Sequence, residues 1–247
     1  MKTLLLGALL LCTTPAFAAD AAIEKSIASP ERTAEDRARD TRDKPSEVLA
    51  FAGVKPGMVV ADIFSGGGYY AELLSGVVGP AGKVLAVNNM PYAAYSKDGI
   101  KARFTEGRLK NVDRRLVEAS YMNVARASVD LVVIVMAYHD AYWIDEKEGW
   151  PEIDIDGFHQ SLKRMLKPGG KLLIVDHNAA AGSGRDAAGK LHRLNEDFAK
   201  KSLTAHGFVF EKSYDGLRNP QDQLDKMVYD AAVKGKTDRY VHLYRMK

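Results

Sequence analysis

Histidine and aspartate side chains occur together at two places in the sequence, each directly after an apolar run. His139 and Asp140 follow the run 131–137, and Asp176 and His177 follow the run 171–175. Imidazole and carboxylate groups exchange protons near neutral pH, and a carboxylate can orient a neighbouring imidazole. We therefore predict His139, Asp140 and His177 as catalytic residues, with one histidine as general base. The alternative is that these polar residues only cap helices or bond to the backbone.

The same side chains could instead bind a divalent metal ion, because imidazole and carboxylate are both suitable ligands. His192, with Glu196 one turn further on, adds to this group of polar residues. No two histidines have the i, i+4 spacing of a metalloprotease helix. We therefore predict no metal ligands, and a metal-dependent enzyme that uses these residues stays an alternative.

A glycine-rich turn lies between another apolar run and a helical pattern. It begins at Asp62, continues through Ser65 and ends with Gly66, Gly67 and Gly68. Glycine lets backbone N–H groups approach a ligand closely, and the start of the following helix adds further donors. In open α/β sheets, ligands bind at such turns beyond the carboxyl ends of the strands. The turn predicts a nucleotide-like cofactor, although a G-x-G-x-x-G dinucleotide fingerprint fits it poorly. A tight turn without a ligand is the alternative.

Apolar runs and helical patterns alternate along the chain and must position these residues. Strands are expected over 58–63, 83–87, 115–118, 131–137, 171–175, 209–214 and 239–244. Helices are expected over 69–77, 100–108, 157–166 and 191–205. The nearly unbroken apolar run 131–137 is typical of a central parallel strand that is buried on both faces. The alternation predicts an α/β protein with a parallel sheet and helices on both faces.

Several segments resemble motifs of the class I S-adenosylmethionine (SAM) dependent methyltransferases. VVADIFSGGGYYAELLS, residues 59–75, resembles motif I, in which an acidic residue ends a strand and a glycine-rich turn follows. Residues 84–89 and 129–133 look like the second and fourth strands, and LKPGGKLLIVDH, 166–177, is similar to the helix-turn-strand of this fold. The resemblance covers about residue 43 to the C-terminus. It is closest to exported or periplasmic predicted methyltransferases, and more distant to the quinone-biosynthesis C-methyltransferases.

This resemblance implies a Rossmann-like, seven-stranded, mostly parallel sheet, SAM as cofactor and a small-molecule acceptor. The residues that it implies for cofactor binding are Asp62, Ser65, Gly66, Gly67, Gly68, Asn88, Asn89 and Ser120. Phe64 stands where the family usually has its first glycine. Asn88 or Asn89 replaces the acidic residue that binds the ribose hydroxyls, and Ser120 replaces an acid near the adenine. An amide binds hydroxyls less strongly than a carboxylate does, so weaker SAM binding is expected.

The first 18 residues have the pattern of a signal peptide. Lys2 precedes the apolar run Leu4 to Leu11, and Ala16-Phe17-Ala18 fits a cleavage site after Ala18. A buried first helix is the alternative. We predict a periplasmic or secreted protein with three parts: the signal peptide 1–18, a polar extension 19–44 with a flexible lead and short helices, and a methyltransferase-like domain 45–247.

Composition narrows the range of partners. The net charge is only +3, and no basic block indicates nucleic acid. No apolar stretch after residue 18 is long enough for membrane insertion. We interpret the acidic segment 145–152 as a solvated connection; the alternative is a lid with Trp150 facing a pocket. The sequence thus favours methyl transfer to a small molecule, with a non-catalytic binding module as the alternative, and indicates no oligomeric state.

Overall fold

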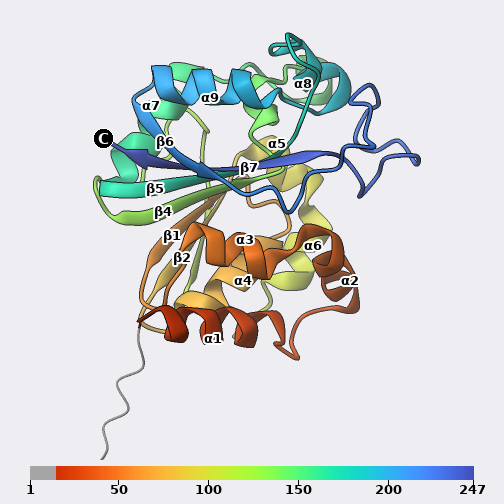
Figure 1. Cartoon of the computed structure of the whole chain (residues 1–247). Helices are drawn as coiled ribbons and strands as arrows, with labels where there is room; N and C mark the ends of the chain where they lie inside the picture. Colours follow the sequence, from red (N-terminus) through yellow and green to blue (C-terminus); the bar gives the residue numbers. More distant parts are fainter. Residues whose placement is uncertain (1–14) are drawn as a thin grey trace, which may run out of the picture.

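Seven strands form one twisted sheet in the computed structural model, which describes residues 15–247 (Figure 1). The strands lie in the order β3-β2-β1-β4-β5-β7-β6. Only β7 runs antiparallel to its neighbours, β5 and β6. The bounds are β1 Val59–Ile63, β2 Lys83–Asn88, β3 Val112–Leu116, β4 Val129–Val135, β5 Leu166–His177, β6 Phe208–Ser213 and β7 Arg239–Met246. This is the class I methyltransferase arrangement, which confirms the predicted fold class.

Helices cover both faces of the sheet (Figure 1). Among them, α1, α3 and α4 lie on one face, and α7 and α9 lie on the other. Their bounds are α1 Pro15–Ile27, α2 Ala34–Asp43, α3 Pro45–Ala52, α4 Tyr69–Val78, α5 Met90–Tyr95, α6 Lys97–Arg103, α7 Ile155–Met165, α8 Asp186–Leu191 and α9 Glu196–Ala205. None of the described helices is long and apolar enough to cross a membrane.

The central strand β4 supplies side chains to two apolar cores. Val132 and Ile134 pack into one core with Phe158 and Leu162 of α7. Val133, which points the opposite way, packs into the other core with residues of α3 and α4. Because side chains alternate across a strand, burial on both faces requires the continuous apolar run seen in the sequence.

The structure differs from the expected elements mainly where the chain is polar. The third strand is 112–116 instead of 115–118, because this exposed edge strand has no apolar run to fix its position. The expected helix over 191–205 is interrupted, since residues 192–195 form a loop between α8 and α9. β5 begins at Leu166, so it includes the Lys-Pro-Gly-Gly segment that was expected to be a turn.

The N-terminal extension packs on the sheet domain, so the predicted flexible lead is wrong for the part that is described. Ile23 of α1 is buried, and Ser26 Oγ donates to the carbonyl of Leu73 on α4 at 2.7 Å. Gly76 of α4 permits this approach, since a Cβ there would lie 2.3 Å from Ser26 Oγ. Residues 1–14 of the predicted signal peptide lie outside the described residues, and the predicted cut after Ala18 falls in the first turn of α1.

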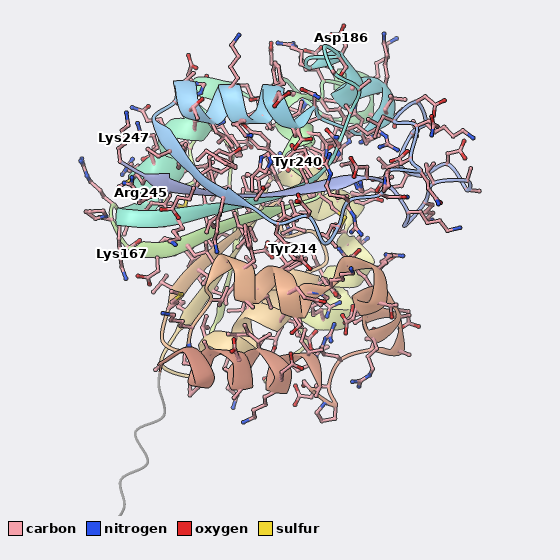
Figure 2. All side chains as sticks on the ribbon, viewed as in Figure 1. Lys167, Asp186, Tyr214, Tyr240, Arg245 and Lys247 are labelled. Atoms are coloured by element: carbon pink, nitrogen blue, oxygen red, sulfur yellow. The ribbon has the colours of Figure 1, made fainter. Side chains whose placement is uncertain are left out.

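The two ends of the sheet differ in what they present. Lys167, Arg245 and Lys247 gather at the end where β5 begins and β7 finishes (Figure 2). The parallel strands β1 and β4 finish at the opposite end, where the glycine turn and the His/Asp segments lie. Ligands of open α/β sheets bind at that carboxyl end.

Candidate active site

A pocket of about 480 Å³ opens at the carboxyl ends of β1 and β4. Its volume is within the range of small-molecule and cofactor sites. One side is lined by Asp62, Phe64, Ser65, Gly66 and Gly67, and the other by Ala137, Asp140, Trp143, Trp150 and His192. The pocket therefore brings the glycine turn and part of the His/Asp group together, as their positions after neighbouring parallel strands predict.

The glycine turn is held in a conformation that only glycine adopts easily. Gly66 and Gly68 have φ of 56° and 85°. A Cβ on Gly68 would also lie 2.6 Å from Cζ of Phe104, so the site has no room for a side chain. Gly68 is the N-cap of α4, and the turn thus leads directly into a helix N-terminus. This geometry can bind polar groups through backbone N–H donors.

Asp62 is a buried carboxyl at the pocket wall. Ser65 Oγ donates to Asp62 Oδ2 at 2.7 Å. Burial raises the pKa of the Asp62 carboxyl to about 7, although the Ser65 hydrogen bond opposes the shift. A cation bound in the pocket would favour the ionised carboxylate. SAM carries a sulfonium cation and an amino group, so this end of the pocket suits it.

Asn88 and Asn89 do not take the positions expected for ribose-binding residues. Asn88 Oδ1 accepts from the Gly66 N–H at 2.9 Å, and its Nδ2 donates to the Gly66 carbonyl at 3.0 Å. Asn89 Oδ1 accepts from Tyr92 N–H and caps α5. Neither asparagine lines the pocket. Asn88 instead fixes the peptide of the glycine turn from behind.

Phe64 and Ser120 were the other two departures from the family pattern. Phe64 adopts a φ of 55° and stacks on Tyr92 with ring centroids 4.8 Å apart, so it lines the pocket as an aromatic wall. Ser120 is not brought to the pocket. Its hydroxyl donates to the Asp154 carbonyl at 3.3 Å, and it lies in a separate surface depression. An adenine-binding role for Ser120 stays a prediction without support from this geometry.

Residues of the N-terminal extension line the pocket on the side of the glycine turn. Asp36 and Arg39 of α2 line the pocket. Asp36 accepts two hydrogen bonds from Arg103, at 2.8 and 2.9 Å, and Arg103 Nε donates to the Gly67 carbonyl at 2.8 Å. Arg39 lies over the Tyr69 ring, 3.9 Å from its centroid. The extension therefore braces the glycine turn through a charged bridge, which the sequence did not indicate.

His139 lies behind the pocket wall between two carboxylates. Its Nδ1 is 2.7 Å from Asp176 Oδ1, and its Nε2 is 3.2 Å from Asp140 Oδ1. The backbone N–H of His139 donates to the other oxygen of Asp176. Burial disfavours the imidazolium, but Asp140 and Asp176 outweigh this effect and raise the pKa of His139 to about 10. The protonated ring is unsuited to the predicted role of general base at neutral pH.

Asp140 and His192 are the members of this group that line the pocket. Burial favours the neutral acid, yet the adjacent His139 holds the pKa of Asp140 below its ordinary range. Tyr92 donates its hydroxyl to Asp140 Oδ2, and His192 Nδ1 lies 3.5 Å from Oδ1. A permanent carboxylate therefore faces the pocket.

His177, the third predicted catalytic residue, does not line the pocket. Its Nδ1 is 2.7 Å from Thr237 Oγ1. Burial, together with the charge of His139, lowers the pKa of His177 well below its usual value. His177 is thus a neutral residue next to His139 that is hydrogen-bonded to the Thr237 side chain, and its catalytic role stays a prediction.

Aromatic rings form the wall around Asp140 and His192. Trp143 packs on Trp150 with centroids 4.4 Å apart and lies edge-on to His192 at 4.7 Å. Tyr229, from the loop before β7, lies 5.3 Å from His192 on the other side. Trp150 thus faces the pocket, as the lid alternative for 145–152 proposed. Such a wall suits a planar ligand.

Three of the eight non-glycine residues with a left-handed backbone in the described part of the chain line this pocket. Phe64, Met136 and His192 have φ values of 55°, 53° and 51° and all three line it. A left-handed conformation is costly for residues other than glycine, and it persists at sites that the surrounding structure fixes for function. His192 would not project beside Asp140 without this turn.

Comparisons with known sequences find methyltransferases among the relatives of this chain. No protein-family model matches the chain. It is 25% identical over 212 residues to the ubiquinone/menaquinone biosynthesis C-methyltransferase UbiE of Shewanella oneidensis, which covers 80% of this chain and 76% of that protein. It is 32% identical over 128 residues to an arsenite methyltransferase of Halobacterium salinarum, a match to 51% of this chain and only 29% of that relative.

Solved structures share the fold. A SAM-dependent methyltransferase from Aquifex aeolicus superposes with a TM-score of 0.58 at 21% identity, covering 92% of this chain and 98% of that one. An arsenic(III) SAM methyltransferase from Chlamydomonas reinhardtii gives 0.55 at 17% identity, covering 92% and 73%. The [4+2]-cyclase SpnF gives 0.54 at 16%, covering 93% of each. The homologues and neighbours are thus chiefly SAM-dependent methyltransferases, and SAM is the cofactor that they imply.

Proposed function

We propose that this protein is a SAM-dependent methyltransferase that acts on a small molecule. The observation that supports it best is the pocket at the carboxyl ends of β1 and β4, where the glycine turn meets a buried carboxyl and an aromatic wall. SAM supplies an electrophilic methyl group on a sulfonium. The chain's own task is then to bind the donor on the glycine side and to hold the acceptor on the other side.

On the donor side, Asp62 and the glycine turn are the proposed contacts. Asp62 compensates the positive charge of the donor, and the N–H of Gly67 binds one of its polar groups, because the N–H groups of Gly66 and Gly68 already donate to Asn88 and to the Ser65 carbonyl. Asn88 and Arg103 fix the turn from behind. This differs from the expectation that Asn88 contacts the ribose, and it assigns Asn88 a positioning role.

On the acceptor side, the aromatic wall favours a planar, protonated nucleophile such as a phenol or an enol. The acceptor atom forms a bond to the methyl carbon as the carbon–sulfur bond breaks, and the acceptor loses its proton. His192 is the pocket-lining group at this wall that can take that proton, and the Asp140 carboxylate, 3.5 Å from its Nδ1, orients the ring. His139 acts through Asp140 by holding its carboxylate in place.

Methyl transfer can be tested by measuring S-adenosylhomocysteine release from SAM with a panel of phenols, enols, amines and thiols. Turnover above the background of SAM alone is expected for a planar acceptor, and His192→Ala should lower kcat by about 10²- to 10⁴-fold if it takes the proton. Leu224→Ala, at another left-handed non-glycine position, is the matched control. Release that is unchanged in His192→Ala contradicts the assignment of His192.

A non-catalytic binding module with the same fold is the second candidate. The observation that favours it is Asn88, whose amide is already paired with Gly66 in place of an acidic ribose ligand. One structural neighbour with this fold is a [4+2]-cyclase, so the fold also carries other functions. SAM binding without release of S-adenosylhomocysteine for any acceptor would favour this candidate.

We also propose that the protein is exported and cleaved after Ala18, on the basis of Lys2, the apolar run and Ala16-Phe17-Ala18. The contacts of Ile23 and Ser26 would remain after cleavage, so α1 would still dock on α4. The intact mass of protein recovered from the periplasm tests this. A chain that begins at Ala19 supports export, and a full-length cytosolic chain contradicts it.

A further inference from the structure

The His/Asp group at the acceptor wall has the geometry of a metal site. One ligand atom from each of His139, Asp140 and His192 lies within 4.8 Å of the others. We propose that these three residues bind a divalent transition-metal ion of the zinc type at the acceptor side of the pocket. The proposed ion binding does not depend on the proposed methyl transfer. The role of the ion toward an acceptor does depend on the proposed methyl transfer.

Two of the three separations among the ligand atoms fit a metal centre as well as they fit hydrogen bonds, and all three lie within 4.8 Å. His139 Nε2 and His192 Nδ1 lie 3.2 and 3.5 Å from Asp140 Oδ1. Ligand atoms about 2.0–2.1 Å from a tetrahedral Zn²⁺ lie about 3.3–3.4 Å apart. Asp140 Oδ1 is nevertheless buried without a hydrogen bond of acceptable geometry among the described residues. The charged neighbour of this oxygen is the His139 ring, and a bound metal ion would take the place of the proton on its Nε2.

Neighbouring residues orient the three ligands as they do in known metal sites. Asp176 bonds to His139 Nδ1 and leaves Nε2 directed toward Asp140. Tyr92 donates to Asp140 Oδ2, which leaves Oδ1 as a single ligand atom. A carboxylate on the far nitrogen of a ligating histidine fixes its tautomer and raises its basicity.

Charge and access support the same conclusion. Asp140 and Asp176 are both buried, and neither forms an ion pair with a lysine or arginine of residues 15–247. A divalent ion between the imidazoles would compensate them. Because Asp140 and His192 line the pocket, the ion has a route of entry and coordination positions left for a ligand.

The ion would thus face the place proposed for the acceptor. Two imidazoles and one carboxylate form a site with open positions, as in catalytic zinc centres. An acceptor hydroxyl bound to the ion would lose its proton more readily, and the proton would pass to solvent, because His192, the base of the metal-free site, would then be a ligand. The chemistry selects acceptors with an oxygen that can bind a metal, such as phenols and enols.

The test is titration of Zn²⁺ and Co²⁺ into chelator-treated mature protein without SAM, followed by calorimetry and, for Co²⁺, by its visible absorption. One ion per chain is expected. His192→Ala and Asp140→Asn should each weaken binding by about 100-fold, and Asp176→Asn by about 10- to 100-fold. His206→Ala is the matched control, since His206 forms a separate His–Asp pair with Asp156.

Circular dichroism of each variant establishes that it is folded, and the near-isosteric Asp140→Asn change keeps the test valid if His192→Ala unfolds. Absence of Zn²⁺ and Co²⁺ binding in the folded wild-type protein overturns the proposal. Equal binding by wild type, Asp140→Asn and His192→Ala also overturns it, because the ion would then lie elsewhere. SAM binding is measured separately, so either proposal can fail alone.

Discussion

Asp62 illustrates how a single residue links burial to ligand chemistry. Burial raises its pKa to about 7, so the folded protein retains a proton on this carboxyl at a pH where an unfolded chain has lost it. The stability that this provides is complete below the unfolded pKa of about 4 and is lost as the pH rises toward 7. The same burial makes Asp62 responsive to a cationic ligand.

Replacement of Asp62 by asparagine should therefore change the pH dependence of stability. Relative to wild type, Asp62→Asn should gain on the order of 1–4 kcal/mol between about pH 4 and pH 7.5, because the wild type alone must ionise a buried carboxyl. Urea unfolding of both proteins at the two pH values measures this. A difference between the two proteins that is the same at both pH values would show that Asp62 ionises normally.

Asn88→Asp, a change toward the usual family residue, should weaken the protein. The Asn88 amide donates to the Gly66 carbonyl, whereas a carboxylate would face that carbonyl with a lone pair. Loss of this bond should cost about 1–3 kcal/mol of stability and lower SAM affinity with it. Thermal unfolding and SAM titration are the measurements. Tighter SAM binding by a fully stable Asn88→Asp protein would contradict this and would support the original expectation that residue 88 contacts the ribose of SAM.

At the scale of elements, α2 shows that charged residues of the extension can be buried through partners far away in the sequence. Its alternating charges look like a solvated face, yet Asp36 and Asp43 are buried. Their partners Arg103 and Arg239 are 67 and 196 residues away in the sequence. No local pattern reports such pairs, whereas β1 and β4 were predictable because burial on both faces leaves a local apolar run.

The charged bridge from α2 to the glycine turn should affect the cofactor. Asp36→Asn removes one of the two carboxylates that pair with Arg103, the other being Glu72, and Arg103 Nε donates to the Gly67 carbonyl. SAM affinity should fall about tenfold, or about 1.4 kcal/mol. Glu35→Gln, an exposed charge change on the same helix, is the matched control and should have no effect. Equal affinities of the two variants would mean that α2 does not brace the turn.

At the scale of the whole molecule, the pocket combines parts that the sequence predicted with parts that it did not. His139 and Asp140 follow β4 and Asp176 follows its parallel neighbour β5, and the structure brings these three together, whereas His177, which was also predicted as catalytic, does not line the pocket. His192 reaches them through a left-handed turn at the end of α8. Position 192 is neither glycine nor asparagine, the residue types that would predict this turn. Long-range packing, as with Tyr92 and Arg103, accounts for the rest of the site.

The central claim is that this pocket binds SAM, and calorimetric titration of SAM into the mature protein tests it most directly. Gly68→Ala is the informative variant, since its Cβ would meet Phe104 at 2.6 Å. Gly149→Ala is the control, because Gly149 has a similar φ of 81° but open space around its Cα. We predict SAM binding by the wild type and by Gly149→Ala, and loss of binding by Gly68→Ala. Absence of SAM binding by folded wild-type protein, or equal binding by all three, would contradict the account.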